Sequence, residues 1–244
     1  MALGSQPGWN VRPAGGVQAD IDVGLRDYML RVYNYMASGL ALTGIVAYVA
    51  AAGGANSFIA HIYHTPLMWL VMLSPLGFVL ALSYGINRMQ FSTTQMVFWA
   101  FAAVMGLSIS TIFLVYTGAS IARVFFITAG TFAGMSLYGY TTRRDLTAIG
   151  SFLFMGLIGI IIASLVNIFL QSPAIYFAVS VLGVLIFVGL TAYDTQRIKA
   201  TYYSYQYADG QVAGKIAIMG ALSLYLDFIN LFMFLLQLFG VRRD

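Results

Sequence analysis

The chain has no cysteine and no glutamate, and charged residues make up only 8% of its 244 residues. Without cysteine, disulfides, thiolate metal sites and cysteine nucleophiles are excluded. Without glutamate, zinc-protease motifs that depend on that residue are excluded as well. An average soluble domain is about 25% charged, so this chain has too few charges for a water-facing surface. A soluble enzyme and a nucleic-acid partner are therefore not expected, and the net charge of +4 is interpreted as loop charge on a membrane protein.

Long apolar runs take the place of the missing charges. No Asp, Glu, Lys or Arg occurs in residues 32–87, 89–122, 124–142, 146–193 and 228–241. Because one membrane-spanning helix needs about 20 apolar residues, the first and fourth of these runs each hold two spans, and the second and third hold one each. A last run to Phe239 is interrupted by a single acid, Asp227. The pattern predicts an all-α, multi-pass membrane protein with seven transmembrane helices in a lipid bilayer.

Turn-forming residues between the apolar runs indicate where these seven helices begin and end. They are predicted at about 28–52, 67–87, 94–116, 121–140, 146–170 and 174–199, and from the Asp209-Gly210 turn to about 239. Residues 1–27 are predicted to be a short cytoplasmic tail, residues 28–240 the transmembrane domain, and residues 241–244 a short C-terminal tail.

Orientation is predicted from lysine and arginine alone. The N-terminal tail and the second–third, fourth–fifth and sixth–seventh turns hold most of these residues, whereas the opposite loops hold only Arg123. The N-terminus should therefore be cytoplasmic. A full crossing of the last helix would place Arg242 and Arg243 outside, and we favour that crossing over a re-entrant helix because the apolar run is long enough.

Two acids lie inside apolar helices, Asp194 and Asp227. An ionisable group at membrane depth costs several kcal/mol unless it is paired or hydrated. Asp194 lies near a helix end, where it could pair with Arg197 three residues later. Asp227 lies about 18 Å along its helix from Lys215, which predicts that it faces protein or water.

The last helix also carries a polar stripe around Asp227. Ser223, Asn230 and Gln237 share its face at helical spacing, together with Gly220. Such a stripe either holds helices together or lines a path, and the buried acid favours the path. Ser223, Asn230 and Gln237 are thus candidate pore-lining residues.

Hairpin geometry predicts that the two acids meet. If the turn between the last two helices centres on Gly210, then Asp194 and Asp227 reach nearly the same height on adjacent antiparallel helices. Two carboxylates in low dielectric cannot both ionise cheaply, so they should share a proton and titrate as a unit. A pair of this kind can sense pH, bind a cation or perform acid–base chemistry.

Three segments resemble a known family. Ala221–Phe232 (ALSLYLDFINLF) closely resembles the last-helix signature of the Bax inhibitor family, Tyr193–Ile198 is similar to its sixth-helix motif, and Thr142–Asp145 is similar to its fourth–fifth turn. The resemblance implies a bacterial member, a seven-helix bundle with the seventh helix at its centre, and location in the cytoplasmic membrane.

The resemblance also implies a function, namely a pH-sensitive calcium leak. In that family a buried aspartate pair is the pH sensor, which here corresponds to Asp194 and Asp227, and the same carboxylates would bind Ca²⁺ transiently. A basic residue at the end of the second helix can hold the path closed, and Arg88 stands at the matching place as a possible latch. No enzyme activity and no cofactor are implied, and Ca²⁺ or H⁺ would be the transported partner.

Two alternatives remain open at this stage. Intramembrane aspartyl proteases also place Tyr-Asp in one helix and a second Asp in the next, but their Gly-x-Gly-Asp motif is replaced here by Leu224-Tyr225-Leu226-Asp227. The other alternative is a non-catalytic regulator that binds membrane proteases or cell-death proteins. Gly130 and Gly134 could form a contact face for such membrane-protein partners, although small residues more often serve internal packing.

Overall fold

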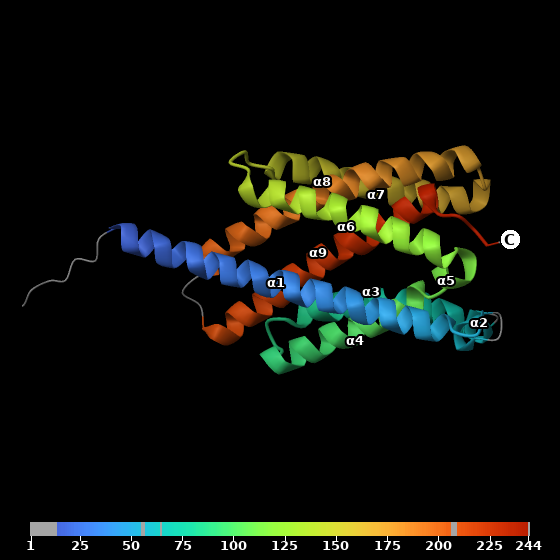
Figure 1. Cartoon of the computed structure of the whole chain (residues 1–244), viewed down its shortest axis with the longest axis horizontal. Coiled ribbons are helices and arrows are strands. Elements are labelled where there is room, and N and C mark those ends of the chain that lie inside the picture. The colour runs from blue at the N-terminus through green and yellow to red at the C-terminus, as the bar shows by residue number, and fades with distance from the viewer. Residues whose placement is uncertain (1–13, 55–56, 64, 206–208, 244) are drawn as a thin grey trace, which may run out of the picture.

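The computed structural model describes residues 14–54, 57–63, 65–205 and 209–243, and over these residues the chain forms nine helices. Seven are long and apolar enough to cross a membrane, which confirms the predicted architecture. The long helices are α1 (Ala14–Ala51), α3 (Leu67–Gly85), α4 (Phe91–Ile109), α6 (Gly118–Thr141), α7 (Thr147–Leu170), α8 (Pro173–Tyr205) and α9 (Gly210–Phe239). Two short helices, α2 (Phe58–Tyr63) and α5 (Ile112–Val115), lie at connections between them (Figure 1).

Three helix boundaries differ from the prediction. α1 begins at Ala14 instead of near Tyr28, and α8 continues to Tyr205 instead of ending near residue 199. No proline interrupts either extension, so the backbone hydrogen bonds of each helix simply continue. The predicted third helix is divided into α4 and α5 at Ser110, whose backbone N–H bonds the carbonyl of Leu107, three residues earlier. The predicted tail residues 1–13 and 244 lie outside the described part of the chain.

Helix α9 is the centre of the bundle. It packs mainly against α1, α4, α6 and α8. Its side chains supply much of the core, and Tyr225, Leu224 and Leu231 are fully buried. By contrast, α3 packs chiefly on α4, and α7 packs chiefly on α8. The central seventh helix is confirmed, but four helices surround it closely while α3 and α7 form an outer layer.

The two ends of α9 lie at opposite ends of the bundle (Figure 1). Near its start, the Lys215 ammonium donates to the carbonyls of Ile86 and Met89 in the α3–α4 turn. Just beyond its end, the chain pairs with the α5–α6 connection, where the Thr117 N–H donates to the Val241 carbonyl. Helix α9 therefore runs through the whole bundle and does not turn back, as the sequence favoured.

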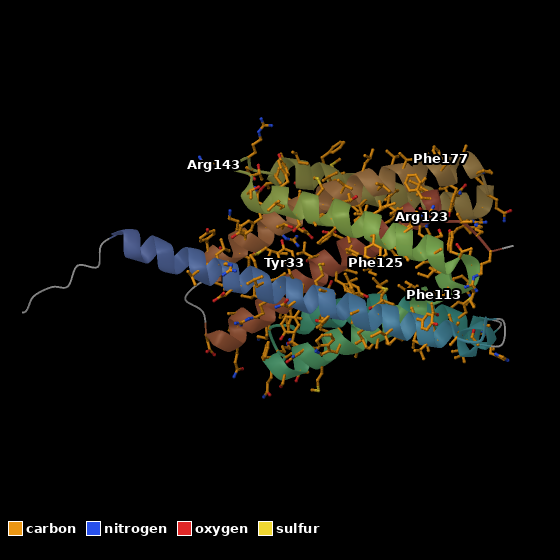
Figure 2. The ribbon with its side chains drawn as sticks, in the orientation of Figure 1. Tyr33, Phe113, Arg123, Phe125, Arg143 and Phe177 are labelled. Carbon is orange, nitrogen blue, oxygen red and sulfur yellow. The ribbon has the colours of Figure 1, made fainter. Side chains whose placement is uncertain are left out.

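The charged turns are divided between the two ends in the predicted way. Arg143 lies at the end that also carries the α3–α4 and α8–α9 turns, whereas Arg123 lies toward the other end (Figure 2). The C-terminal residues Val241–Arg243 dock at that second end beside Tyr116. Which end faces the cytoplasm stays a prediction from the lysine and arginine bias.

Hydrogen bonds between hydroxyl groups join helices that are distant in sequence. Thr195 donates its hydroxyl to the carbonyl of Thr191, so it accepts from Ser136, which in turn accepts from Tyr33. This directed chain links α1, α6 and α8 across O···O distances of 2.6 Å and 2.9 Å. Polar pairing of this kind holds helices together where lipid provides no hydrophobic drive.

Candidate functional site

The α8–α9 hairpin places Asp194 and Asp227 at one cavity. Both residues are buried, with exposed fractions of 6% and 5%. The cavity has a volume of about 540 Å³ and is lined by one stripe of α7 from Phe154 to Ile168, by α8 from Phe187 to Arg197, and by α9 from Ser223 to Phe234. We refer to it as the carboxylate groove. Both acids therefore line one cavity, as hairpin geometry predicted, and a hydrogen bond between them stays a prediction.

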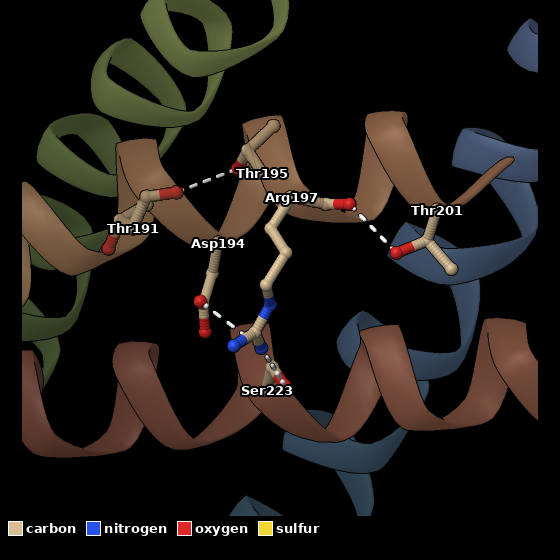
Figure 3. Close-up of polar contacts among 6 residues, drawn as sticks. All are labelled: Thr191, Asp194, Thr195, Arg197, Thr201 and Ser223. Atoms are coloured by element: carbon tan, nitrogen blue, oxygen red, sulfur yellow. Dashed lines mark hydrogen bonds and ion pairs between the residues drawn. The ribbon is translucent and has the colours of Figure 1, made fainter. Parts of the chain in front are cut away.

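Arg197 joins the two helices at the groove. Its Nη2 lies 3.2 Å from Asp194 Oδ1, one helical turn away on α8. The same nitrogen donates to Ser223 Oγ on α9 across 3.2 Å (Figure 3). The guanidinium also lies over the ring of Tyr193, 5.7 Å from its centroid. The i,i+3 pairing that the spacing allowed is therefore present, and it extends to a second helix.

The two carboxylates remain incompletely satisfied. Asp227 Oδ2 is buried and has no hydrogen-bond partner among the described residues. Asp194 Oδ1 has none either, because its contact with Arg197 has the distance of an ion pair without the geometry of a hydrogen bond. A buried polar oxygen without a partner costs about 1–3 kcal/mol, and more when it is charged. The groove therefore presents carboxylate oxygens that a donor or a cation would stabilise.

The predicted pore-lining residues divide into two groups. Ser223 and Asn230 line the carboxylate groove beside Asp227. The Asn230 amide donates to the Leu226 carbonyl within α9, across 2.8 Å. Gln237 lies nearer the far end of α9, where its side-chain carbonyl accepts a hydrogen bond from Ser180. Only the first group faces the same space as the acids, so the polar stripe serves two purposes along its length.

Arg88 lies in the exposed α3–α4 turn. Within the described part of the chain, the one side-chain ion pair joins Asp194 to Arg197, and none joins Arg88 to an acid. The turn itself is held to α9 by Lys215, which donates to the carbonyls of Ile86 and Met89. The predicted Arg88 latch is thus not formed in this conformation, and the basic group on Asp194 is Arg197.

The level of the acids follows from the packing of α7 on α8. Gly150, in the first turn of α7, faces the ring of Tyr193, and Leu153 packs over Gly189. Asp194 therefore lies level with the first two turns of α7, within about 10 Å of the α6–α7 turn. Relative to α7, Asp194 therefore lies toward the end of the bundle that carries the α6–α7 turn.

Helix α7 is the part of the site that sequence reasoning missed. Its residues are almost uniformly apolar, so no polar stripe marks the side that faces the acids. For Arg197, the sequence predicts only a local contact with Asp194. The i,i+3 spacing indicates the pairing of Arg197 with Asp194. The contact of Arg197 with Ser223 depends on how α8 and α9 pack, which the spacing does not indicate.

The donor set suits a transient cation. Ca²⁺ takes 6–8 oxygen ligands, and the groove offers two carboxylates, the Ser223 hydroxyl and the Asn230 amide. The described residues contain no group of three or more potential metal-ligating acids, histidines or cysteines. The arrangement therefore lacks the ligands of a permanent metal centre, whereas a passing ion could keep part of its water shell.

Comparisons with known proteins place the chain clearly. A family model described as inhibitor of apoptosis-promoting Bax1 matches residues 25–244. The inner membrane protein YbhL of Escherichia coli K12 is 48% identical over 222 residues, which cover 90% of this chain and 94% of that protein. The RP147 protein of Rickettsia prowazekii is 50% identical over 227 residues, which cover 91% and 93% of the two chains. A protein of Caulobacter vibrioides is 45% identical over 239 residues, which cover 95% of each chain.

Proposed function

The chain belongs to the Bax inhibitor family of integral membrane proteins, and from this premise we propose that it is a pH-sensitive cation leak with Ca²⁺ as the transported ion. Location in the bacterial cytoplasmic membrane, with the N-terminus inside, is part of the proposal and is supported by the likeness to an inner membrane protein. The proposed activity is transport without chemistry, so it needs no catalytic residue and no cofactor.

The observation that carries the proposal is the shared groove of Asp194 and Asp227. Acids at membrane depth are costly and commonly mark ion paths. A negative site lowers the cost of moving a cation out of water, while incomplete coordination lets the ion leave again. Two carboxylates beside one guanidinium supply such a site, with one net negative charge when all three groups are ionised.

We propose that Arg197 is the group that closes the path. It is held by Asp194 and by Ser223, so it bridges α8 and α9 at the groove. Asp194, Arg197 and Asp227 are the charged residues among those that line the groove. In this proposal, protonation of Asp194 weakens its hold on the guanidinium, while the carboxylate of Asp227 keeps its charge and attracts the cation. The leak should therefore increase as the pH falls.

The experiment is calcium flux into liposomes that contain only the purified protein, measured with an internal indicator across pH. We expect flux above that of protein-free liposomes and a clear dependence on pH. Flux equal to that of protein-free liposomes at every pH would overturn the leak.

The buried residues before Asp227 favour the leak over the protease alternative. Leu224 and Tyr225 have exposed fractions of 0%, and a substrate strand would need the space that they fill. The check is incubation of a labelled transmembrane peptide with the pure protein. Cleavage that is lost in Asp227→Ala would favour the protease.

A role as a partner of other membrane proteins has one observation in its favour. Gly130 and Gly134 of α6 are exposed, and a Cβ built on either would meet nothing within 4 Å. They therefore do not serve internal packing and leave a shallow outward surface that another helix could approach. Crosslinking from introduced residues beside these glycines in native membranes tests this role.

A further inference from the structure

The carboxylate groove is open toward the bilayer between α7 and α9. Helix α7 packs chiefly on α8 and makes little contact with α9. The groove therefore has an opening between α7 and α9. The α7 residues Ile161 and Ile168 line the groove and are also exposed, with exposed fractions of 51% and 65%. A molecule dissolved in the bilayer could therefore enter sideways, without passing through either end of the bundle.

Polar and apolar residues are separated along the groove. Asp194, Arg197 and Ser223 lie at the end near the α6–α7 turn, because Tyr193 packs over Gly150 at the start of α7. The opposite end is apolar, since Phe187 and Phe234 stack there with their ring centroids 5.9 Å apart. The α7 stripe between Phe154 and Ile168 is about 21 Å long. The groove thus has a charged end near the α6–α7 turn and a mostly apolar channel, with Ser164 and Asn230 as its polar members, that leads away from that turn.

The charge of the polar end selects the head group. Two carboxylates face one guanidinium, which is already shared between Asp194 and Ser223. Asp227 Oδ2 is buried and has no hydrogen-bond partner among the described residues. A phosphate or carboxylate head would add a further anion beside these acids, whereas a primary ammonium would donate a charge-assisted hydrogen bond to the unpaired Asp227 oxygen.

We propose that the carboxylate groove binds a single-chain amphiphile with a primary ammonium head, whose head lies at Asp194 and Asp227 and whose hydrocarbon chain lies against α7. The cavity volume of about 540 Å³ is in the range of sites for small ligands. A bound amphiphile would occupy the carboxylates of the proposed leak. Binding itself does not depend on the leak, because the contacts that carry it are made whether or not an ion passes.

The test measures binding directly, with the full chain in nanodiscs made of phosphatidylcholine. Dodecylamine is titrated by calorimetry, and dodecanol, which has the same chain and a neutral head, is the matched ligand. We expect one dodecylamine per chain and affinity for dodecanol that is weaker by about tenfold or more, since the neutral head cannot form a charge-assisted hydrogen bond with Asp227. Equal affinity for the two ligands would overturn the head-group assignment.

Two variants of α7 test where the chain lies. Ile161→Trp fills the groove, whereas Ile162→Trp adds the same bulk at an exposed neighbour that does not line it. Dodecylamine binding should be weakened about tenfold or more only in Ile161→Trp. Equal affinity in both variants would overturn the position of the chain. If Ile161→Trp does not fold, Ser164→Leu narrows the same stripe with a smaller change.

Asp227→Asn tests the contact with the head group. It should weaken dodecylamine binding and leave dodecanol binding unchanged, because only the charge is removed. Dodecylamine binding by Asp227→Asn that is as tight as in the wild type would contradict the proposal. Displacement of dodecylamine by phosphatidylethanolamine added to the nanodiscs would identify a two-chain lipid as the occupant and overturn the single-chain assignment. Since no flux is measured, absence of a calcium leak would leave these results interpretable.

Discussion

Arg197 Nη2 and Asp194 Oδ1 lie 3.2 Å apart on the same face of α8. The carboxylate side chain is 8% exposed, whereas that of the arginine is 44% exposed. The ion pair therefore joins the buried carboxylate of Asp194 to a guanidinium side chain that is partly exposed at the surface of the bundle. Through this ion pair, the buried acids Asp194 and Asp227 could respond to the pH of the surrounding solution.

The first prediction concerns the buried acid of α9. Asp227→Asn keeps the shape of the side chain and removes its charge, so we expect calcium flux to fall sharply or to lose its dependence on pH. The measurement is indicator fluorescence in proteoliposomes across pH.

Asp145 provides the matched control, because it is an exposed aspartate in the α6–α7 turn. Its carboxylate accepts hydrogen bonds from the Thr147 N–H and hydroxyl, and these bonds hold the pKa of Asp145 below its usual value. Their contribution to stability is present at neutral pH and is lost only as the pH falls through that lowered pKa. Asp145→Asn should therefore leave the neutral pH response of the flux intact. An identical profile for wild type and Asp227→Asn would count against the sensor.

The second prediction separates two candidate latches. If Arg197 closes the path, Arg197→Ala and Asp194→Asn should show coupled effects on flux in a double-mutant cycle. A latch worth about 1.4 kcal/mol changes the open fraction about tenfold. Arg88→Ala, combined with the same Asp194→Asn, is the parallel cycle. Coupling only in the Arg88 cycle would show that Arg88, and not Arg197, is the latch. Additive effects in both cycles would exclude both arginines as latches on Asp194.

The third prediction concerns a hydrogen bond at the centre of the bundle. Thr43 donates to the Ala102 carbonyl across 2.8 Å, so the Tyr225 hydroxyl, 2.6 Å away, must donate to Thr43. Tyr225→Phe removes only the last donor and should cost about 0.5–1 kcal/mol of unfolding free energy. Thr43→Val leaves the buried tyrosine hydroxyl without its partner, so it should cost about 1–3 kcal/mol. Thermal unfolding in one detergent compares the variants, and the reverse order would contradict the assigned donor direction.

The fourth prediction concerns topology. The absence of cysteine allows single cysteines to be introduced without background labelling. Arg143→Cys should be protected from an impermeant thiol reagent in intact cells, because its turn carries the basic residues that favour the cytoplasm. Arg242→Cys should be labelled, because α9 runs to the opposite end of the bundle. Labelling of Arg143→Cys alone would reverse the orientation.

The sequence by itself determined the class of the protein and the location of its helices. Runs without charge have the length of a membrane span, and backbone groups in lipid must bond within their own segment, so each run becomes a helix whatever its neighbours are. The position of Asp194 and Asp227 at comparable height followed from helical rise and one turn. The Arg197 partner was within reach of its i,i+3 spacing.

Only the tertiary structure decided what these acids face. The contact of Arg197 with Ser223, the separation of α7 from α9 and the bilayer side of the groove depend on how helices pack, which side-chain periodicity does not specify when a helix is apolar on every face. In lipid, Ile161 on α7 is equally acceptable against a neighbour or against hydrocarbon. The sequence therefore did not indicate that α7 forms the apolar wall of the site. It did indicate the buried charges, because an unpaired charge is costly in lipid.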